Sequence, residues 1–229
     1  IKYSYAMPEN TTHTDKTLSF CEFVKEAQVT GKKFFITKDD DNCFGKMALG
    51  MIPKPPLGAS GQAGYDFGVF KTPAPNARIY NSMTTLVPGS VNFVIFSPVA
   101  ICDFDPDLII CVAEVEKAEI IMRATSYISG DFWESKCSSV LSCAWMYSYP
   151  YVSGKVNFCI TGMHHGMKRR GTYPPGRHII AIPYQKINEV VQALDEMDWE
   201  LIAMRKDDAS KAELARRMAH WQEMSPDFV

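Results

Sequence analysis

A pattern that occurs twice along the chain constrains its fold more than any other feature of the sequence. In the first copy, an amphipathic stretch containing Cys21 leads to a Gly-Lys turn and an apolar run that ends in Ile-Thr at Thr37. In the second copy, Cys143 leads to another Gly-Lys turn and a run that ends in Ile-Thr at Thr161. The same order of helix, turn and strand in both places predicts an internal duplication.

The sequence that follows each copy agrees with a duplication. Gly- and Pro-rich loops at 57–64 and 171–176 come next, and each leads to a predicted strand that ends at a proline, Pro73 or Pro183, before a helix. We therefore expect two related halves arranged about a pseudo-twofold axis. Binding sites often form in a cleft to which two such halves both supply groups.

Periodicity predicts the elements of an α/β fold. Apolar residues recur at helical spacing in Thr17–Val29, Asn76–Leu86, Glu116–Ile128 and Ile187–Met197. Short β-branched and aromatic runs typical of strands occur at Ile1–Tyr5, Lys33–Thr37, Gly68–Lys71, Val91–Phe96, Leu108–Val112, Val156–Thr161 and His178–Ile182. These elements predict one domain over 1–198, made of halves at about 1–100 and 101–198, with a mixed sheet flanked by helices.

The last part of the chain, 199–229, differs from the rest. Residues 206–221 are rich in Ala, Lys, Arg and Glu, and a mildly apolar stripe includes Ala212, Ala215 and Met218. This composition predicts a C-terminal helical extension. Such an arm can pack on the body or on a second subunit, and we favour the second subunit, which predicts a homo-oligomer.

The balance of charge excludes some classes of partner. The formal net charge is −2, and the only dense basic run is residues 168–170, so the chain has no field that would hold nucleic acid or an anionic membrane. No apolar run approaches the roughly 20 residues of a membrane span. We therefore expect a small-molecule ligand, and neither nucleic acid nor membrane as a partner.

The cysteines indicate the cellular compartment. The seven cysteines are an odd number with irregular spacing, and no Cys-x-x-Cys occurs. Secreted disulfide scaffolds are usually shorter and carry paired cysteines, so we expect reduced thiols in a cytoplasmic protein. No signal peptide is visible, and a first residue other than methionine leaves an earlier natural start open.

Fragments along residues 15–197 resemble, in the right order, the DUF169 family of uncharacterised archaeal and bacterial proteins. The fragments that carry the resemblance include Asp41-Asn-Cys43-Phe-Gly45, Ala48-Leu-Gly50, Pro88-Gly-Ser90, Ser139-Val-Leu-Ser-Cys143 and Ile180-Ala-Ile-Pro183. The resemblance implies cysteines at positions matching Cys21, Cys43, Cys143 and Cys159, and it brings no established reaction.

The chain departs from the family pattern after Cys159. The family has a short Gly-Cys-x-Gly-x-Arg there, whereas this chain continues with Met163-His164-His165-Gly166. Two alternatives stay open for the arginine of that motif: either Arg169 or Arg170 takes its place in this chain, or this chain lacks it. An anion-binding role carried over from the family is therefore in doubt.

Four cysteines allow three interpretations. Thiolates from Cys21, Cys43, Cys143 and Cys159 would suit a metal ion or an iron–sulfur cluster if the fold brings them together. A reactive thiol is the second interpretation, with Cys43, Cys143 or Cys159 as the catalytic residue. Cys43 is the best candidate if 43–49 is a short helix, whose N-terminus lowers a thiol pKa. In the third interpretation, the cysteines are small buried apolar residues.

Two further segments contain candidate site residues. His164 and His165 follow a predicted strand, so either side chain could transfer protons or bind a metal, and Arg169 or Arg170 could hold a carboxylate or phosphate. The other segment is the Gly-rich loop 58–68. In this loop, glycines permit close approach to a ligand, and the candidate contacts are Ser60, Gly61 and Tyr65. Exposed turns without a ligand are the alternative in both segments.

Two hypotheses of different classes follow. In the first, the chain is an enzyme that acts on a small anionic or aromatic compound, with cysteine and histidine chemistry at the interface of the two halves. In the second, it is a non-catalytic protein that binds a metal, an iron–sulfur cluster or another cofactor through the four cysteines. The sequence determines neither the substrate nor the reaction.

Overall fold

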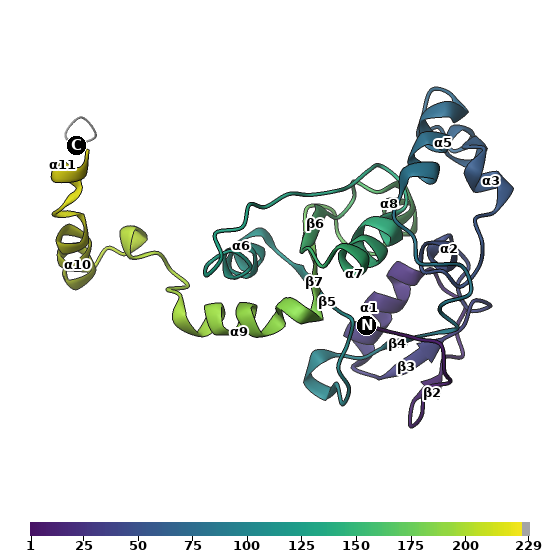
Figure 1. Cartoon of the computed structure of the whole chain (residues 1–229), viewed down its shortest axis with the longest axis horizontal. Coiled ribbons are helices and arrows are strands. Elements are labelled where there is room, and N and C mark those ends of the chain that lie inside the picture. Colours follow the sequence, from purple (N-terminus) through teal and green to yellow (C-terminus); the bar gives the residue numbers. More distant parts are fainter. Residues whose placement is uncertain (226–229) are drawn as a thin grey trace.

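A computed structural model describes residues 1–225 and contains two small sheets with helices packed on them (Figure 1). The first sheet has the order β1-β4-β3-β2. Its strands are β1 (Lys2–Ser4), β2 (Thr12–His13), β3 (Phe34–Ile36) and β4 (Phe93–Phe96). Because β2 is parallel to β3 while the other neighbours are antiparallel, this sheet is mixed.

The second sheet is antiparallel and has the order β5-β7-β6. It contains β5 (Leu108–Ala113), β6 (Asn157–Ile160) and the central β7 (His178–Pro183), in which residues 179–182 are fully buried or nearly so. The predicted α/β fold with a mixed sheet is confirmed, although a second sheet accompanies the mixed one. In the first sheet β4 pairs with β1 and β3 on its two edges, and β5 pairs with β7 in the second sheet.

Helix α1 (Phe20–Thr30) connects the first sheet to the site described below. The side chain of Glu22 accepts a hydrogen bond from the backbone N–H of Ser19 at the N-terminus, which satisfies one of the free donors of the first turn. Apolar side chains at helical spacing, Phe20, Phe23 and Ala27, are buried against the sheet. The helix ends at Gly31, whose φ of 65° favours glycine.

A group of short helices follows β3. It consists of α2 (Gly45–Ala48), α3 (Pro56–Ala59), α4 (Gln62–Asp66) and α5 (Pro73–Ser82). The predicted strand at Gly68–Lys71 is wrong, because these residues form the turn between α4 and α5. Gly68 has a φ of 69°, outside the β region, and Pro73 starts a helix because its ring presets the helical φ.

The second half contributes α6 (Val115–Ala124), α7 (Tyr149–Ser153), α8 (His165–Arg170) and α9 (Ile187–Glu196), and a π-helical turn at Ala144–Ser148. Helices α6 and α9 agree with the predicted ones and pack on each other and on the second sheet. The larger core contains residues of both halves, among them Phe20, Phe96, Tyr147 and Ile179.

The two sheets resemble each other in topology. In both, the strand after a left-handed glycine (β3 after Gly31, β6 after Gly154) pairs antiparallel with a strand later in its half, β4 or β7. That later strand pairs antiparallel with the first strand of its half, β1 or β5. These features agree with an internal duplication, which stays a prediction. The strand expected to end at Pro73 is absent, and β4 takes the corresponding place.

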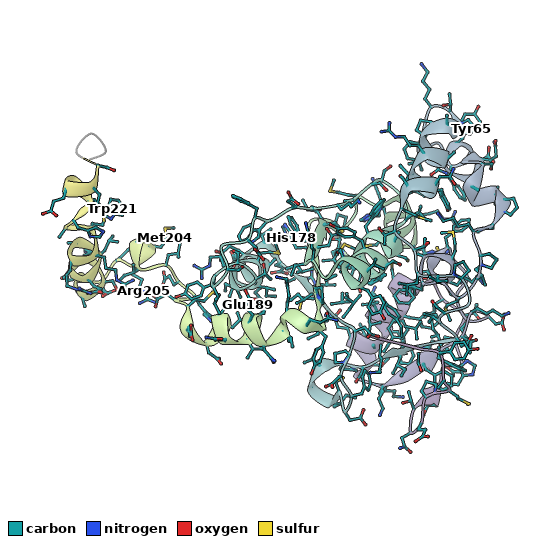
Figure 2. The ribbon with its side chains drawn as sticks, in the orientation of Figure 1. Tyr65, His178, Glu189, Met204, Arg205 and Trp221 are labelled. Carbon is teal, nitrogen blue, oxygen red and sulfur yellow. The ribbon has the colours of Figure 1, made fainter. Side chains whose placement is uncertain are left out.

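The C-terminal segment projects from the body (Figures 1 and 2). Helix α10 (Asp208–Met218) packs mainly on a short 3-10 turn at Ile202–Met204, and α11 (Trp221–Met224) follows it. The predicted helical arm is therefore present in the described residues. Within residues 1–225, no helix combines the length and apolar character required to cross a membrane.

Candidate functional site

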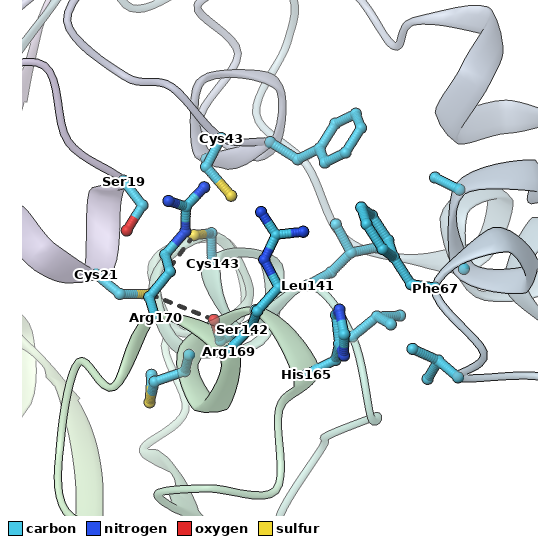
Figure 3. A pocket seen from close by; sticks show the side chains of 18 of the residues that line it. Ser19, Cys21, Cys43, Phe67, Leu141, Ser142, Cys143, His165, Arg169 and Arg170 are labelled. Carbon is cyan, nitrogen blue, oxygen red and sulfur yellow. Dashed lines mark hydrogen bonds between the residues drawn. The ribbon is translucent and has the colours of Figure 1, made fainter.

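A cleft of about 540 Å³ lies where the two halves meet (Figure 3). The first half supplies residues of α1, α2, α4 and α5, and the second half supplies the 140–143 segment and α8. Phe44, Phe67 and Tyr80 give the cleft an aromatic side. A cavity of this size and lining suits a small molecule with an apolar or aromatic body.

Two cysteines from opposite halves meet at the cleft. The sulfur atoms of Cys21 on α1 and Cys143 before the π-helical turn are 3.9 Å apart, and both residues are buried. Ser142 Oγ lies 3.3 Å from the Cys21 sulfur, and the Tyr147 hydroxyl donates to the same sulfur over 3.8 Å. Three polar groups therefore surround the sulfur of Cys21.

These contacts favour a thiolate at Cys21. The hydrogen bond from Cys143, with further ones from Ser142 and Tyr147, lowers the pKa of Cys21 to about 7 against the opposing effect of burial. The same hydrogen bond and burial raise the pKa of Cys143 well above its ordinary value. Above about pH 7 the pair therefore holds one proton, and Cys143 is the thiol.

Cys43 is half-buried and also lines the cleft. Burial, followed by the nearby carboxylate of Asp41, raises its pKa. The helix expected to lower this pKa starts only at Gly45 and is four residues long. Asp41 instead accepts hydrogen bonds from the backbone N–H groups of Cys43 and Lys46 and so holds the loop in place. Cys43 is thus a neutral thiol at neutral pH.

Cationic side chains border the cleft. Arg169 is exposed and lies over the Phe67 ring at 5.0 Å, and Arg170 lies 3.8 Å from the carboxylate of Glu22. Both arginines come from α8, and Lys46 adds a third positive charge. A guanidinium group held against an aromatic face is well placed to bind a carboxylate or phosphate.

Two buried polar atoms at the cleft have no protein partner. The Nε2 atom of His165 is one, and Oδ1 of Asn76 is the other. Burial and then the charge of Arg169 lower the pKa of His165, so its ring is neutral at neutral pH. Since buried polar groups are normally hydrogen-bonded, a ligand that satisfies these two atoms would bind favourably.

His164 and Cys159 do not line the cleft and belong to a second cluster. The sulfur of Cys137 lies 3.2 Å from Nε2 of His164, and the sulfur of Cys159 lies 3.6 Å from Nδ1 of the same ring. A hydrogen bond between the two cysteines lowers the pKa of Cys137 and raises that of Cys159. Within residues 1–225, this is the only group of three or more Cys, His, Asp or Glu ligand atoms close enough for one metal ion.

The sequence did not identify Cys137 as a site residue. Cys137 lies in an irregular segment with neither Cys-x-x-Cys spacing nor strand periodicity, and it meets Cys159 only through the fold. The short spacing between Cys159 and His164 was the one local signal of this cluster. The four cysteines proposed as one ligand set are divided by the structure, because Cys159 lies with Cys137 and His164.

The three candidate contacts in the Gly-rich loop 58–68 do not reach the cleft, although Ala63, Gly64 and Phe67 of the same loop line it. Ser60 Oγ donates to the backbone oxygen of Leu57, and Tyr65 is exposed at the outer edge of the molecule (Figure 2). A Cβ atom on Gly61 would lie 2.1 Å from the backbone oxygen of Pro73, so α5 approaches too closely for any other residue. None of Ser60, Gly61 and Tyr65 is among the lining residues of the cleft.

Comparison with known proteins gives one family and one relative. The model of the DUF169 family, described as uncharacterised ArCR, matches residues 1–193. An uncharacterised protein of the archaeon Methanocaldococcus jannaschii is 24% identical over 192 residues, which cover 82% of this chain and 81% of the relative. No solved structure matches the chain.

Proposed function

This chain belongs to the DUF169 family, and from that premise we propose that it is an enzyme that acts on a small anionic compound with a cysteine thiolate. The compound binds in the cleft between the halves, and Cys21 is the thiolate. One observation carries the proposal: Cys21 and Cys143 meet from opposite halves in a cleft that also holds Arg169 and Arg170.

Each group has a role that follows from its position. The Cys21 thiolate is the nucleophile, since thiolates and not thiols attack electrophilic centres. Arg169 and Arg170 bind the anionic group of the compound, and the aromatic side of the cleft packs on its body. His165, neutral and without a partner at Nε2, accepts or returns a proton.

The cysteine-based cofactor hypothesis has less support from these contacts. The cleft contains three of its four cysteines, and Cys159 lies in the other cluster. A cluster or metal bound by Cys21, Cys43, Cys143 and Cys159 would therefore require the fold to rearrange. Because all seven cysteines are free, we also propose the cytoplasm as the compartment.

Alkylation with two reagents of different charge tests the proposal. Iodoacetate is anionic and iodoacetamide is neutral, and the site of reaction can be mapped by mass spectrometry. We expect Cys21 to react at pH 7 and to favour iodoacetate over iodoacetamide, relative to a free thiol in solution. The reason is that the cleft cations concentrate the anionic reagent.

The double variant Arg169→Gln, Arg170→Gln is the matched control. It should reduce the preference for iodoacetate at Cys21 by roughly tenfold, which corresponds to about 1.4 kcal/mol of lost binding, and leave the rate with iodoacetamide similar. If the ratio of the iodoacetate rate to the iodoacetamide rate at Cys21 equals that of a free thiol in solution, or if only Cys43 reacts, the proposal is contradicted.

A further inference from the structure

We infer that Cys137, Cys159 and His164 form a mononuclear zinc site, distinct from the cleft. Their ligand atoms all lie within 4.8 Å of one another. Ligands of one tetrahedral zinc ion lie about 3.3–3.8 Å apart, since the Zn–S distance is about 2.3 Å and the Zn–N distance about 2.0 Å. An imidazole gives one zinc ion a single nitrogen, so only one of the two sulfur–nitrogen distances, 3.2 Å to Nε2 or 3.6 Å to Nδ1, separates two ligands, and each is close to this range.

The fold holds Cys137 in place although its segment has no regular structure. The buried side chain of Asn157 accepts from the backbone N–H of Lys136 and donates to its backbone oxygen. On the other side, the backbone oxygen of Ser139 accepts from the N–H of His165 over 2.7 Å. Cys137 is thus fixed between two anchors, one on β6 and one on α8, which carry or adjoin the other two ligands.

The chemistry of the donor set selects the metal. Two thiolates and a neutral imidazole around Zn²⁺ sum to zero charge, which suits a site where Cys159 and His164 are buried. Iron–sulfur clusters usually require four protein ligands, and Mg²⁺ and Ca²⁺ prefer oxygen. Since the chain supplies three ligands and Cys137 is exposed, solvent can fill the fourth position, as in sites that keep one position open.

The bound ion would fasten the irregular 131–140 segment to β6 and to the start of α8. The same segment runs directly into Val140–Cys143, which forms one wall of the cleft. A metal at this place therefore stabilises the wall that carries Cys143 without taking part in the reaction proposed for the cleft.

Cobalt titration tests the site. The full chain is purified under reducing, oxygen-free conditions, metal is removed with a chelator, and Co²⁺ is added as a spectroscopic substitute for Zn²⁺. We expect one equivalent to bind with a thiolate-to-cobalt charge-transfer band, which Zn²⁺ then abolishes by displacement. The band is independent of any enzyme activity.

Three single variants make the outcome decisive. Cys137→Ser changes an exposed side chain, so the fold should persist. The loss of this ligand should weaken Co²⁺ binding by roughly tenfold or more and reduce the charge-transfer band. Cys102→Ser, half-buried and outside both clusters, should bind Co²⁺ as the unchanged chain does. Cys21→Ser should also retain the band, which separates this site from the cleft.

Two results would overturn the inference. One is the absence of a thiolate-to-cobalt band in the unchanged chain. The other is a band that survives in Cys137→Ser and disappears in Cys21→Ser, which would place the metal on the cleft thiols. Failure of the alkylation experiment on Cys21 would leave this site unaffected, because no ligand is shared.

Discussion

At the scale of single residues, the sharing of one proton by Cys21 and Cys143 is the most consequential feature. A free cysteine has a pKa near 8.5, so only a few per cent is thiolate at pH 7. Because Cys143, Ser142 and Tyr147 contact the sulfur of Cys21, about half of the Cys21 side chains are in the reactive thiolate form at that pH. Reactivity thus depends on neighbours from the other half of the chain.

The pH profile of alkylation is a direct measure of this sharing. Because hydrogen bonds to the thiolate lower its pKa, the rate at Cys21 with iodoacetamide should rise with pH through about 7 and level off above it. Cys143→Ala removes the strongest of these bonds, so the midpoint should move upward toward 8.5. Site-resolved mass spectrometry between pH 5 and 10 gives both curves, and coincident midpoints would refute this account.

Residue type and order predicted part of the site. His165, Arg169 and Arg170 line the cleft and belong to the polar segment after β6, as a segment that follows a strand of an α/β fold often does. The predicted Cys21, Cys43 and Cys143 line it as well. Cys43 is disfavoured as the thiolate, because burial and then the nearby carboxylate of Asp41 raise its pKa. Cys137 was missed because its partners come from distant segments, and no local pattern encodes such a meeting.

At the scale of elements, the close packing of α4 against α5 shapes one side of the cleft. A Cβ atom on Gly64 would lie 2.4 Å from the side chain of Asn76, which is buried and donates to the backbone oxygen of Gly61. Glycine is therefore needed at position 64 for α5 to approach. The requirement is one of space, since Gly64 has an ordinary helical backbone.

The substitution Gly64→Ala tests this packing against a matched substitution. We expect it to lower the free energy of unfolding by about 1–3 kcal/mol, because the Cβ atom displaces the buried Asn76 and disturbs its hydrogen bond to the backbone oxygen of Gly61. In Gly166→Ala on α8, the added Cβ atom would meet no atom within 4 Å. This substitution should raise the free energy of unfolding by up to about 1 kcal/mol, because alanine favours a helix. Denaturant unfolding measures both changes, and equal effects would contradict the packing argument.

Periodicity predicted the long elements better than the short ones. Helices α1, α6 and α9 have a clear apolar stripe, and β3, β4 and β7 are apolar runs with well-marked ends. The Gly68–Lys71 prediction failed because two large apolar residues in a row, Val69 and Phe70, are equally compatible with a turn, and the left-handed φ of Gly68 excludes a strand there. Helices of four or five residues such as α3 and α4 are too short to show a period.

At the scale of the whole molecule, the projecting arm has few contacts with its own body. Helix α10 has 11 residues, and an isolated helix of that length is only marginally stable in water. Large apolar side chains along the arm, among them Trp199, Met204 and Trp221, are exposed. A helix of this kind needs a partner surface, and a second copy of the chain is the partner we expect.

Removal of residues 199–229 should therefore convert an oligomer into a monomer and leave the body folded. The body keeps both sheets and both cores, so its unfolding midpoint should change little at low protein concentration. Light scattering after size-exclusion chromatography, over a wide range of concentrations, measures the mass of the full and shortened chains.

In the full chain, Trp221→Asp should also favour the monomer, because it places a charge among apolar side chains, whereas Arg217→Ser on the charged face should not. A full chain that is monomeric at every concentration would rule out a second copy as the partner of the arm.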